Sequence, residues 1–230
     1  MKNFYYRTMD AASFKKLINK YFSPNIRELG WKGSGFNFYE LTENHVINIF
    51  GIQGSWYGGS VCCETAIHFD FLPELSGKTD PKKISYASCL IRQRLSPTGE
   101  GDYHWNFKKM EEDNIKSVNE IWKAFTEFGL DFYNDFSNFP HPFDLIRPED
   151  INPNNRKLLD KYFILNFIDF IWLLKEINIL LGKNDVAKNF SDLGIRFSIE
   201  LHNELMNKTK SKKVQQDLMK HLSIRMKQFQ

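Results

Sequence analysis

The clearest pattern along the chain is an alternation of residue character between Val61 and Phe71. Successive side chains of a β-strand point to opposite faces, so a period of two predicts a strand, here a central one. One face is predicted to enter the core, and it carries Val61, Cys63, Thr65, Ile67, Phe69 and Phe71. The other face is predicted to be partly solvated, and it carries Cys62, Glu64, Ala66, His68 and Asp70.

Other stretches rich in apolar, aromatic and β-branched residues predict the rest of a sheet, at residues 36–41, 46–52, 89–95 and 103–107. The first two flank a short polar segment, which favours a β-hairpin. The third carries Arg92 and Arg94 on a single face. The fourth is only a candidate strand, so the expected sheet has four to five strands.

Helical periodicity, with apolar residues three or four positions apart, precedes and follows the strands. Asp10 is the predicted N-cap of a first helix that ends at Gly30. A second amphipathic helix is predicted over residues 115–139. Residues 162–181 are apolar on nearly every side, which predicts a helix buried in the core. Two more helices are predicted to follow, the last from about Ser211.

The fold class predicted from this order is α+β, in two parts. A proline-rich stretch separates the parts, with four of the eight prolines at Pro140, Pro142, Pro148 and Pro153. Proline lacks a backbone donor and disfavours helix before it, which predicts an extended connector over 140–155. The predicted domains are therefore a sheet domain at 1–139, with an N-terminal helix and an antiparallel or mixed sheet packed by helices, and an all-helical region at 156–230.

A series of spaced aromatic, glycine and arginine positions carries a family resemblance. It includes Leu29-Gly30-Trp31-Lys32, Phe69-Asp70-Phe71-Leu72-Pro73, Cys89-Leu90-Ile91-Arg92-Gln93-Arg94-Leu95 and Gly101-Asp102-Tyr103-His104-Trp105. From about Phe14 to Ile146, roughly the first two thirds, the chain resembles the bacterial family known as domain of unknown function 4304. Members usually have two tryptophans where this chain has His104-Trp105. The resemblance implies no assigned activity and therefore no catalytic residues.

The composition suits a folded protein of the cytoplasm. A content of 42% hydrophobic and 15% aromatic residues is enough to build a sizeable core in 230 residues. Charged residues interrupt the first sixteen positions, so no secretory signal is expected. Three cysteines without a C-x-x-C spacing favour a reducing compartment. Charges within 162–181 argue against a membrane span, so no membrane association is expected.

Candidate ligand-binding residues gather around the polar face of the central strand. Glu64, His68 and Asp70 lie on that face at even spacing, and such side chains can bind a metal ion. Adding the arginines of the next strand and a nearby aromatic residue gives the candidate set Glu64, His68, Asp70, Arg92, Arg94 and Trp105. The simpler interpretation is favoured: polar side chains on a half-solvated face, with the arginines extended over it. No metal and no cofactor are expected.

A cysteine nucleophile is disfavoured by distance. Cys62 and His68 are six residues apart on one strand, about 20 Å at a rise of about 3.3 Å per residue, so His68 cannot activate that thiol. Buried structural thiols are the preferred interpretation of the cysteines. No residue is therefore assigned a catalytic role.

Three functional hypotheses remain. The preferred one is a non-catalytic cytoplasmic interaction protein, of an accessory or immunity-like kind, with a protein partner. A metal-dependent or hydrolytic enzyme using His68, Asp70 and Arg92 is the first alternative. The second is nucleic-acid binding, because residues 205–230 contain seven basic residues against Asp217 alone, although the net charge of the chain is only +3.

Overall fold

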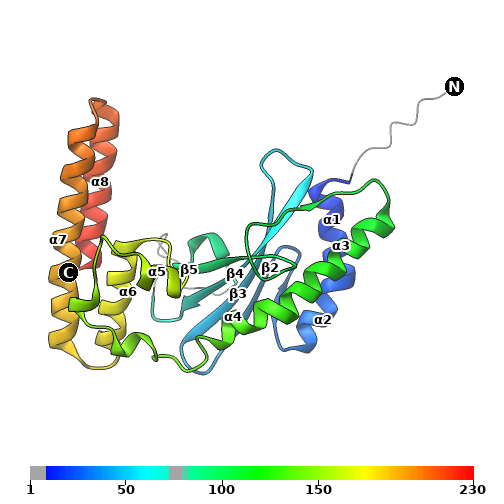
Figure 1. Cartoon of the computed structure of the whole chain (residues 1–230), viewed down its shortest axis with the longest axis horizontal. Helices are drawn as coiled ribbons and strands as arrows, with labels where there is room; N and C mark the ends of the chain where they lie inside the picture. The colour runs from blue at the N-terminus through cyan, green and yellow to red at the C-terminus, as the bar shows by residue number, and fades with distance from the viewer. Residues whose placement is uncertain (1–8, 73–79, 81) are drawn as a thin grey trace. The chain divides into compact units, whose positions relative to one another are not determined.

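The protein forms two compact units that meet between Phe139 and Pro140 in the sequence. The structure is a computed structural model and describes residues 9–72, 80 and 82–230 (Figure 1). In the first unit a helical run precedes the strands and another follows them, whereas the second unit is helical. The α+β class predicted from the sequence is confirmed.

The first unit is built on an antiparallel sheet in the order β1-β2-β3-β4-β5, with β6 also paired to β4. The strands are β1 Lys32–Ser34, β2 Asn37–Leu41, β3 Val46–Gly54, β4 Ser60–Phe69, β5 Ile91–Leu95 and β6 Trp105–Asn106. The described strands number six, one more than expected, because the sequence pattern did not reveal the short β1. β4 pairs with β3 along one edge and with β5 and β6 along the other, so it lies inside the sheet as predicted.

Two helical runs cover one face of this sheet. The first consists of α1 Ala11–Leu17, the π-helical η1 Ile18–Phe22 and α2 Ser23–Glu28, and the second of α3 Glu111–Ala124, η3 Phe125–Gly129 and α4 Leu130–Asn134. Asp10 caps the first run as predicted, since the Ser13 amide donates to its carboxylate at 2.8 Å. The second run begins at Glu111 and ends at Asn134, so the predicted bounds 115–139 are displaced toward the N-terminus.

Aromatic rings fill the space between the helices and the sheet. Phe22 stacks on Phe50 of β3 with ring centroids 5.2 Å apart, and Phe125 meets the edge of Phe50 at 5.0 Å. Trp31 packs on Phe125 at 5.4 Å. All four side chains are buried, and each burial stabilises the fold by about 1.5–3 kcal/mol. These ring contacts hold both helical runs against the middle of the sheet.

The opposite face of the sheet is also covered, which corrects the prediction of a partly solvated face. Cys62, Glu64, Ala66 and His68 are all buried. The cover includes Ile84, Cys89 and Tyr86, which begins the 3₁₀ turn η2 Tyr86–Ser88. A side chain at Gly51 would overlap the Tyr86 ring, with its Cβ only 1.9 Å from a ring carbon, so glycine is what lets this segment approach the strand.

The second unit contains three principal helices, α6 Phe167–Leu180, α7 Asn184–Lys208 and α8 Lys212–Gln228. α6 is buried along most of its length, as predicted, although Asn166 caps it and the helix starts five residues later than 162. Ser211 caps α8 at the predicted position. The stretch 140–155 is not simply extended, because it holds the 3₁₀ turns η4 Phe143–Leu145 and η5 Pro148–Asp150, and the short helix α5 Lys157–Lys161 follows it.

Among the described residues, no helix combines the length and the apolar character needed to cross a membrane. α6 has the most apolar composition, but it contains only 14 residues.

We expect Phe69→Ala to lower the free energy of unfolding by about 3–5 kcal/mol, because the ring is buried and packs on Phe139 at a centroid distance of 5.0 Å. Urea denaturation followed by circular dichroism measures this loss. Leu41→Ala is the control, since Leu41 is 50% exposed and its truncation should cost little. A loss below about 1 kcal/mol for Phe69→Ala would contradict the core position of β4.

The division into domains leads to a second expectation. A chain of residues 1–139 alone should unfold in one cooperative transition, because it retains the sheet and both helical runs. A chain of residues 1–120 is the control, since it lacks Phe125 and should lose the transition. Calorimetry distinguishes the two results, and a non-cooperative 1–139 fragment would show that the sheet unit needs the helical unit.

Candidate functional site

Three of the predicted site residues come together on the sheet face that Tyr86 covers. In the register of β4 and β5, Glu64 lies opposite Arg94, and Ala66 lies opposite Arg92. Both arginines therefore reach the same carboxylate: Arg92 Nη1 lies 3.1 Å from Glu64 Oε2, and Arg94 Nη1 lies 3.4 Å from Oε1. The Glu64 side chain is buried, so the two guanidinium groups compensate a carboxylate that water does not reach.

Arg94 extends this network toward the edge of the sheet. It donates hydrogen bonds to the Cys62 sulfur and, at 3.3 Å, to Gln53 Oε1. Its Nε lies 3.6 Å from Asp102, which in turn lies 3.7 Å from His104. The donors of Arg94 are thus directed to acceptors of the protein itself, which is the geometry of a structural network.

The other three predicted site residues lie elsewhere. His68 shares the face of Glu64, but it is buried, and its Nε2 lies 2.9 Å from the Leu72 carbonyl oxygen. Asp70 lies in the turn after β4, where it is exposed and pairs with His45 at 2.9 Å. Trp105 pairs with Val61 and so belongs to the opposite face of the sheet. Glu64, His68 and Arg92 thus share one face of the sheet, where Glu64 and His68 are buried rather than exposed, and ligand binding by the six residues stays a prediction.

The cysteines and the acidic residues were the other candidates for chemistry. Cys62, Cys63 and Cys89 are free and buried, and burial raises the pKa of Cys62 and raises that of Cys63 further. A raised pKa keeps the thiol protonated near neutral pH, which disfavours a nucleophilic role. Within residues 9–72, 80 and 82–230, no three His, Cys, Asp or Glu side chains form a group suited to a metal ion.

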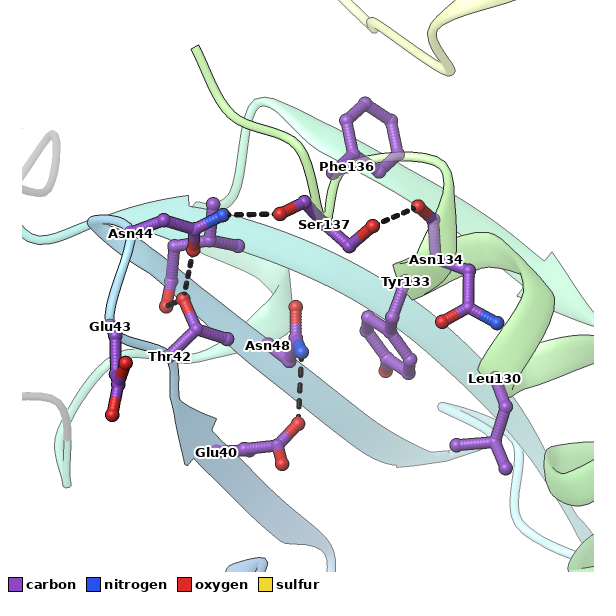
Figure 2. A pocket seen from close by; sticks show the side chains of 11 residues that line it. Glu40, Thr42, Glu43, Asn44, Asn48, Leu130, Tyr133, Asn134, Phe136 and Ser137 are labelled. Atoms are coloured by element: carbon purple, nitrogen blue, oxygen red, sulfur yellow. Dashed lines mark hydrogen bonds between the residues drawn. The ribbon is translucent and has the colours of Figure 1, made fainter. Parts of the chain in front are cut away.

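A polar pocket that the sequence did not predict lies beside β2, β3 and α4 (Figure 2). Its volume is about 450 Å³, within the range of about 300–1,000 Å³ that is usual for small-molecule sites. Its lining consists of Glu40, Thr42, Glu43, Asn44, Val46, Asn48, Leu130, Tyr133, Asn134, Phe136 and Ser137. The available sequence signal was a polar residue in each of two largely apolar strands, Glu40 and Asn48, which strand pairing places opposite each other.

An apolar groove in the helical unit is the third candidate site. It lies between the start of α6, the second half of α7 and α8, and its volume is about 260 Å³. Its lining consists of Asn166, Ile168, Ser198, Leu201, His202, Leu205, Leu218, His221, Leu222 and Arg225. Arg225 forms an ion pair with Asp169 of α6, which ties α8 to the rest of the unit. Ile168 and four leucines give the groove an apolar floor beside these polar residues.

The first unit is thus an α+β domain with helices on one sheet face and an irregular segment on the other. Residues 22–135, about half of the chain, match the family described as Domain of unknown function (DUF4304), and the sheet unit carries a domain of this family. The matched range is shorter than the predicted Phe14 to Ile146. No curated protein and no solved structure matches the chain. The arginine network lies within the matched range and the helical groove lies outside it.

We expect Glu64→Gln to lower the free energy of unfolding by about 1–3 kcal/mol, because it leaves two partly buried arginines without their shared carboxylate. Urea denaturation measures the loss. Glu100→Gln is the control, since Glu100 is exposed and on the same unit. Equal stabilities of the two variants would contradict a structural role for the network.

Proposed function

We propose that this chain is a non-catalytic interaction protein whose helical unit binds an acidic amphipathic helix of a partner protein. The observation that carries the proposal is the apolar surface around the groove between α7 and α8. Leu201, Leu205 and Val214 are 43%, 38% and 43% exposed, and α8 buries no residue along its whole length. Contiguous apolar surface of this kind is typical of protein-binding sites.

The shape of the groove suits a helix. Leucines recur along α7 and α8 at helical spacing, so the groove follows the direction of the two helices. A partner helix with apolar residues at positions i, i+3, i+4 and i+7 buries its apolar face in a groove of this kind. The lining contains no Phe, Tyr or Trp on which bases could stack, which favours a protein partner over nucleic acid.

The charge of the C-terminal segment indicates the charge expected of the partner helix. Residues 205–230 carry seven basic residues and one acidic residue, so this segment has a net positive charge, although Lys208 pairs with Glu204 and Arg225 pairs with Asp169. Charge complementarity favours an acidic partner and accelerates its association. The partner helix is therefore expected to carry Asp or Glu on the face that stays in water.

The sheet unit adds a second exposed apolar feature. Trp56 and Tyr57, in the turn between β3 and β4, are 95% and 97% exposed. Large aromatic residues that are exposed in the free protein often dominate binding energies once a partner buries them. This turn supports a role in protein interaction, although the helical groove carries the proposal.

A cytoplasmic, bacterial protein with an accessory or immunity-like role is part of this proposal. The three free, buried cysteines support a reducing compartment.

The test uses two synthetic helical peptides with the same leucine pattern, one with Glu and one with Lys at the polar positions. We expect the acidic peptide to bind the full chain more tightly in fluorescence anisotropy, and its affinity to fall with salt. Leu205→Glu should weaken binding about tenfold or more, about 1.4 kcal/mol. Ile179→Glu is the matched control, because Ile179 is 45% exposed but lies outside the groove.

Several results would overturn the proposal. Equal affinity for the two peptides would show that charge does not select the partner. Unchanged binding by Leu205→Glu would show that the peptide does not bind in the groove. A single-stranded oligonucleotide that binds more tightly than the acidic peptide would favour the nucleic-acid alternative. Phosphatase or esterase turnover that Arg92→Ala abolishes would favour the enzyme alternative.

A further inference from the structure

The polar pocket of the sheet unit contains a buried acceptor without a partner. Asn48, on β3, is only 6% exposed, and its Nδ2 donates to Glu40 Oε2 at 3.0 Å. This bond fixes the orientation of the amide, and it leaves Oδ1 buried with no hydrogen-bond partner among the described residues. Figure 2 shows the amide between Glu40 and Tyr133, inside the pocket. Buried polar atoms are rarely left unpaired unless a ligand or a function explains them.

Most side-chain groups of the pocket lining that can donate a hydrogen bond have a partner within the protein. The Thr42 hydroxyl donates to the Val46 carbonyl at 2.8 Å, and the Asn44 amide donates to the Ser137 carbonyl at 2.6 Å. The Ser137 and Tyr133 hydroxyls likewise donate to backbone carbonyls, at 2.8 and 2.7 Å. The side-chain amide of Asn134, which is exposed, is a donor that these hydrogen bonds do not use. The lining therefore presents mainly acceptors to a ligand.

The charge of the lining has one sign. Glu40 and Glu43 supply carboxylates, and the pocket lining includes no Lys, Arg or His. Leu130, Tyr133 and Phe136 form an apolar wall beside these groups. Acceptors, negative charge and an apolar wall complement a ligand with several N–H donors, a positive charge and a short alkyl chain.

We infer that the pocket formed by Glu40, Asn48, Tyr133 and their neighbours binds an alkyl ammonium or alkyl guanidinium group. The cationic head donates to Asn48 Oδ1 and to the Glu40 carboxylate, and the alkyl chain lies against Tyr133 and Leu130. The pocket lies in the sheet unit, so this site is separate from the helical groove. The group belongs either to a free small molecule or to a Lys or Arg side chain of a protein.

The test compares butylguanidinium with butylurea, a neutral molecule of nearly the same shape. Titration of the full chain, followed by NMR of the Asn48 side-chain amide, should give a saturable shift with butylguanidinium and at least tenfold weaker binding of butylurea. Pentylammonium should bind at the same site. A short peptide with a central arginine, and the same peptide with citrulline, tests the second source. Tenfold tighter binding of the arginine peptide than of butylguanidinium indicates a protein side chain, and equal or weaker binding indicates a small molecule.

Three variants test the named residues. Glu40→Gln should weaken butylguanidinium binding about tenfold, whereas Glu28→Gln, an exposed control on the same unit, should not change it. Asn48→Leu should abolish binding while the chain stays folded, because it removes an unpaired buried oxygen together with the donor to Glu40, and the thermal transition checks the fold. Equal binding of butylurea and butylguanidinium, or full binding by Glu40→Gln or Asn48→Leu, would overturn the inference.

Discussion

Burial of β4 on both faces is the constraint on which the sheet unit depends. Every residue from Ser60 to Phe69 is buried, with helices on one side and Tyr86 and its neighbours on the other. A strand in that position must satisfy each polar side chain inside the protein. The two arginines of β5 meet this requirement for Glu64, and the approach of Tyr86 over Gly51 completes the cover.

The two polar regions of the sheet unit differ in whether their polar atoms all have partners within the protein. In the arginine network, the donors of Arg94 reach the sulfur of Cys62, the amide of Gln53 and two carboxylates, so the polar groups compensate one another. In the pocket of Figure 2, Asn48 keeps an acceptor that the described chain does not use. Residue types that are common in active sites, such as Arg94 and Cys62, can therefore serve the structure alone. An uncharged residue such as Asn48 can instead mark a binding site.

The two units also differ in how much of their apolar surface they bury. The sheet unit buries most of its rings, as in the packing of Phe22, Phe50 and Phe125, and exposes Trp56 and Tyr57 in one turn. The helical unit encloses α6 but leaves much of α7 and α8 uncovered, because two helices alone cannot bury both sides of their apolar stripes. Stability is concentrated in the sheet and α6, and surface available for recognition is concentrated on the last two helices.

Local patterns in the sequence were sufficient to predict several of the helices and strands. Periods of two and of three to four residues gave β4, the first hairpin and the principal helices, and Asp10 and Ser211 marked helix starts through short-range hydrogen bonds. Only the tertiary structure decided what covers each face. The side chain of Glu64 alternates toward one side of β4 whether that side meets water or Tyr86, and Glu40 and Asn48 meet only through strand pairing. Whether a side chain is exposed, and whether two distant side chains meet, depends on contacts between residues far apart in the sequence. Local periodicity carries no information about those contacts.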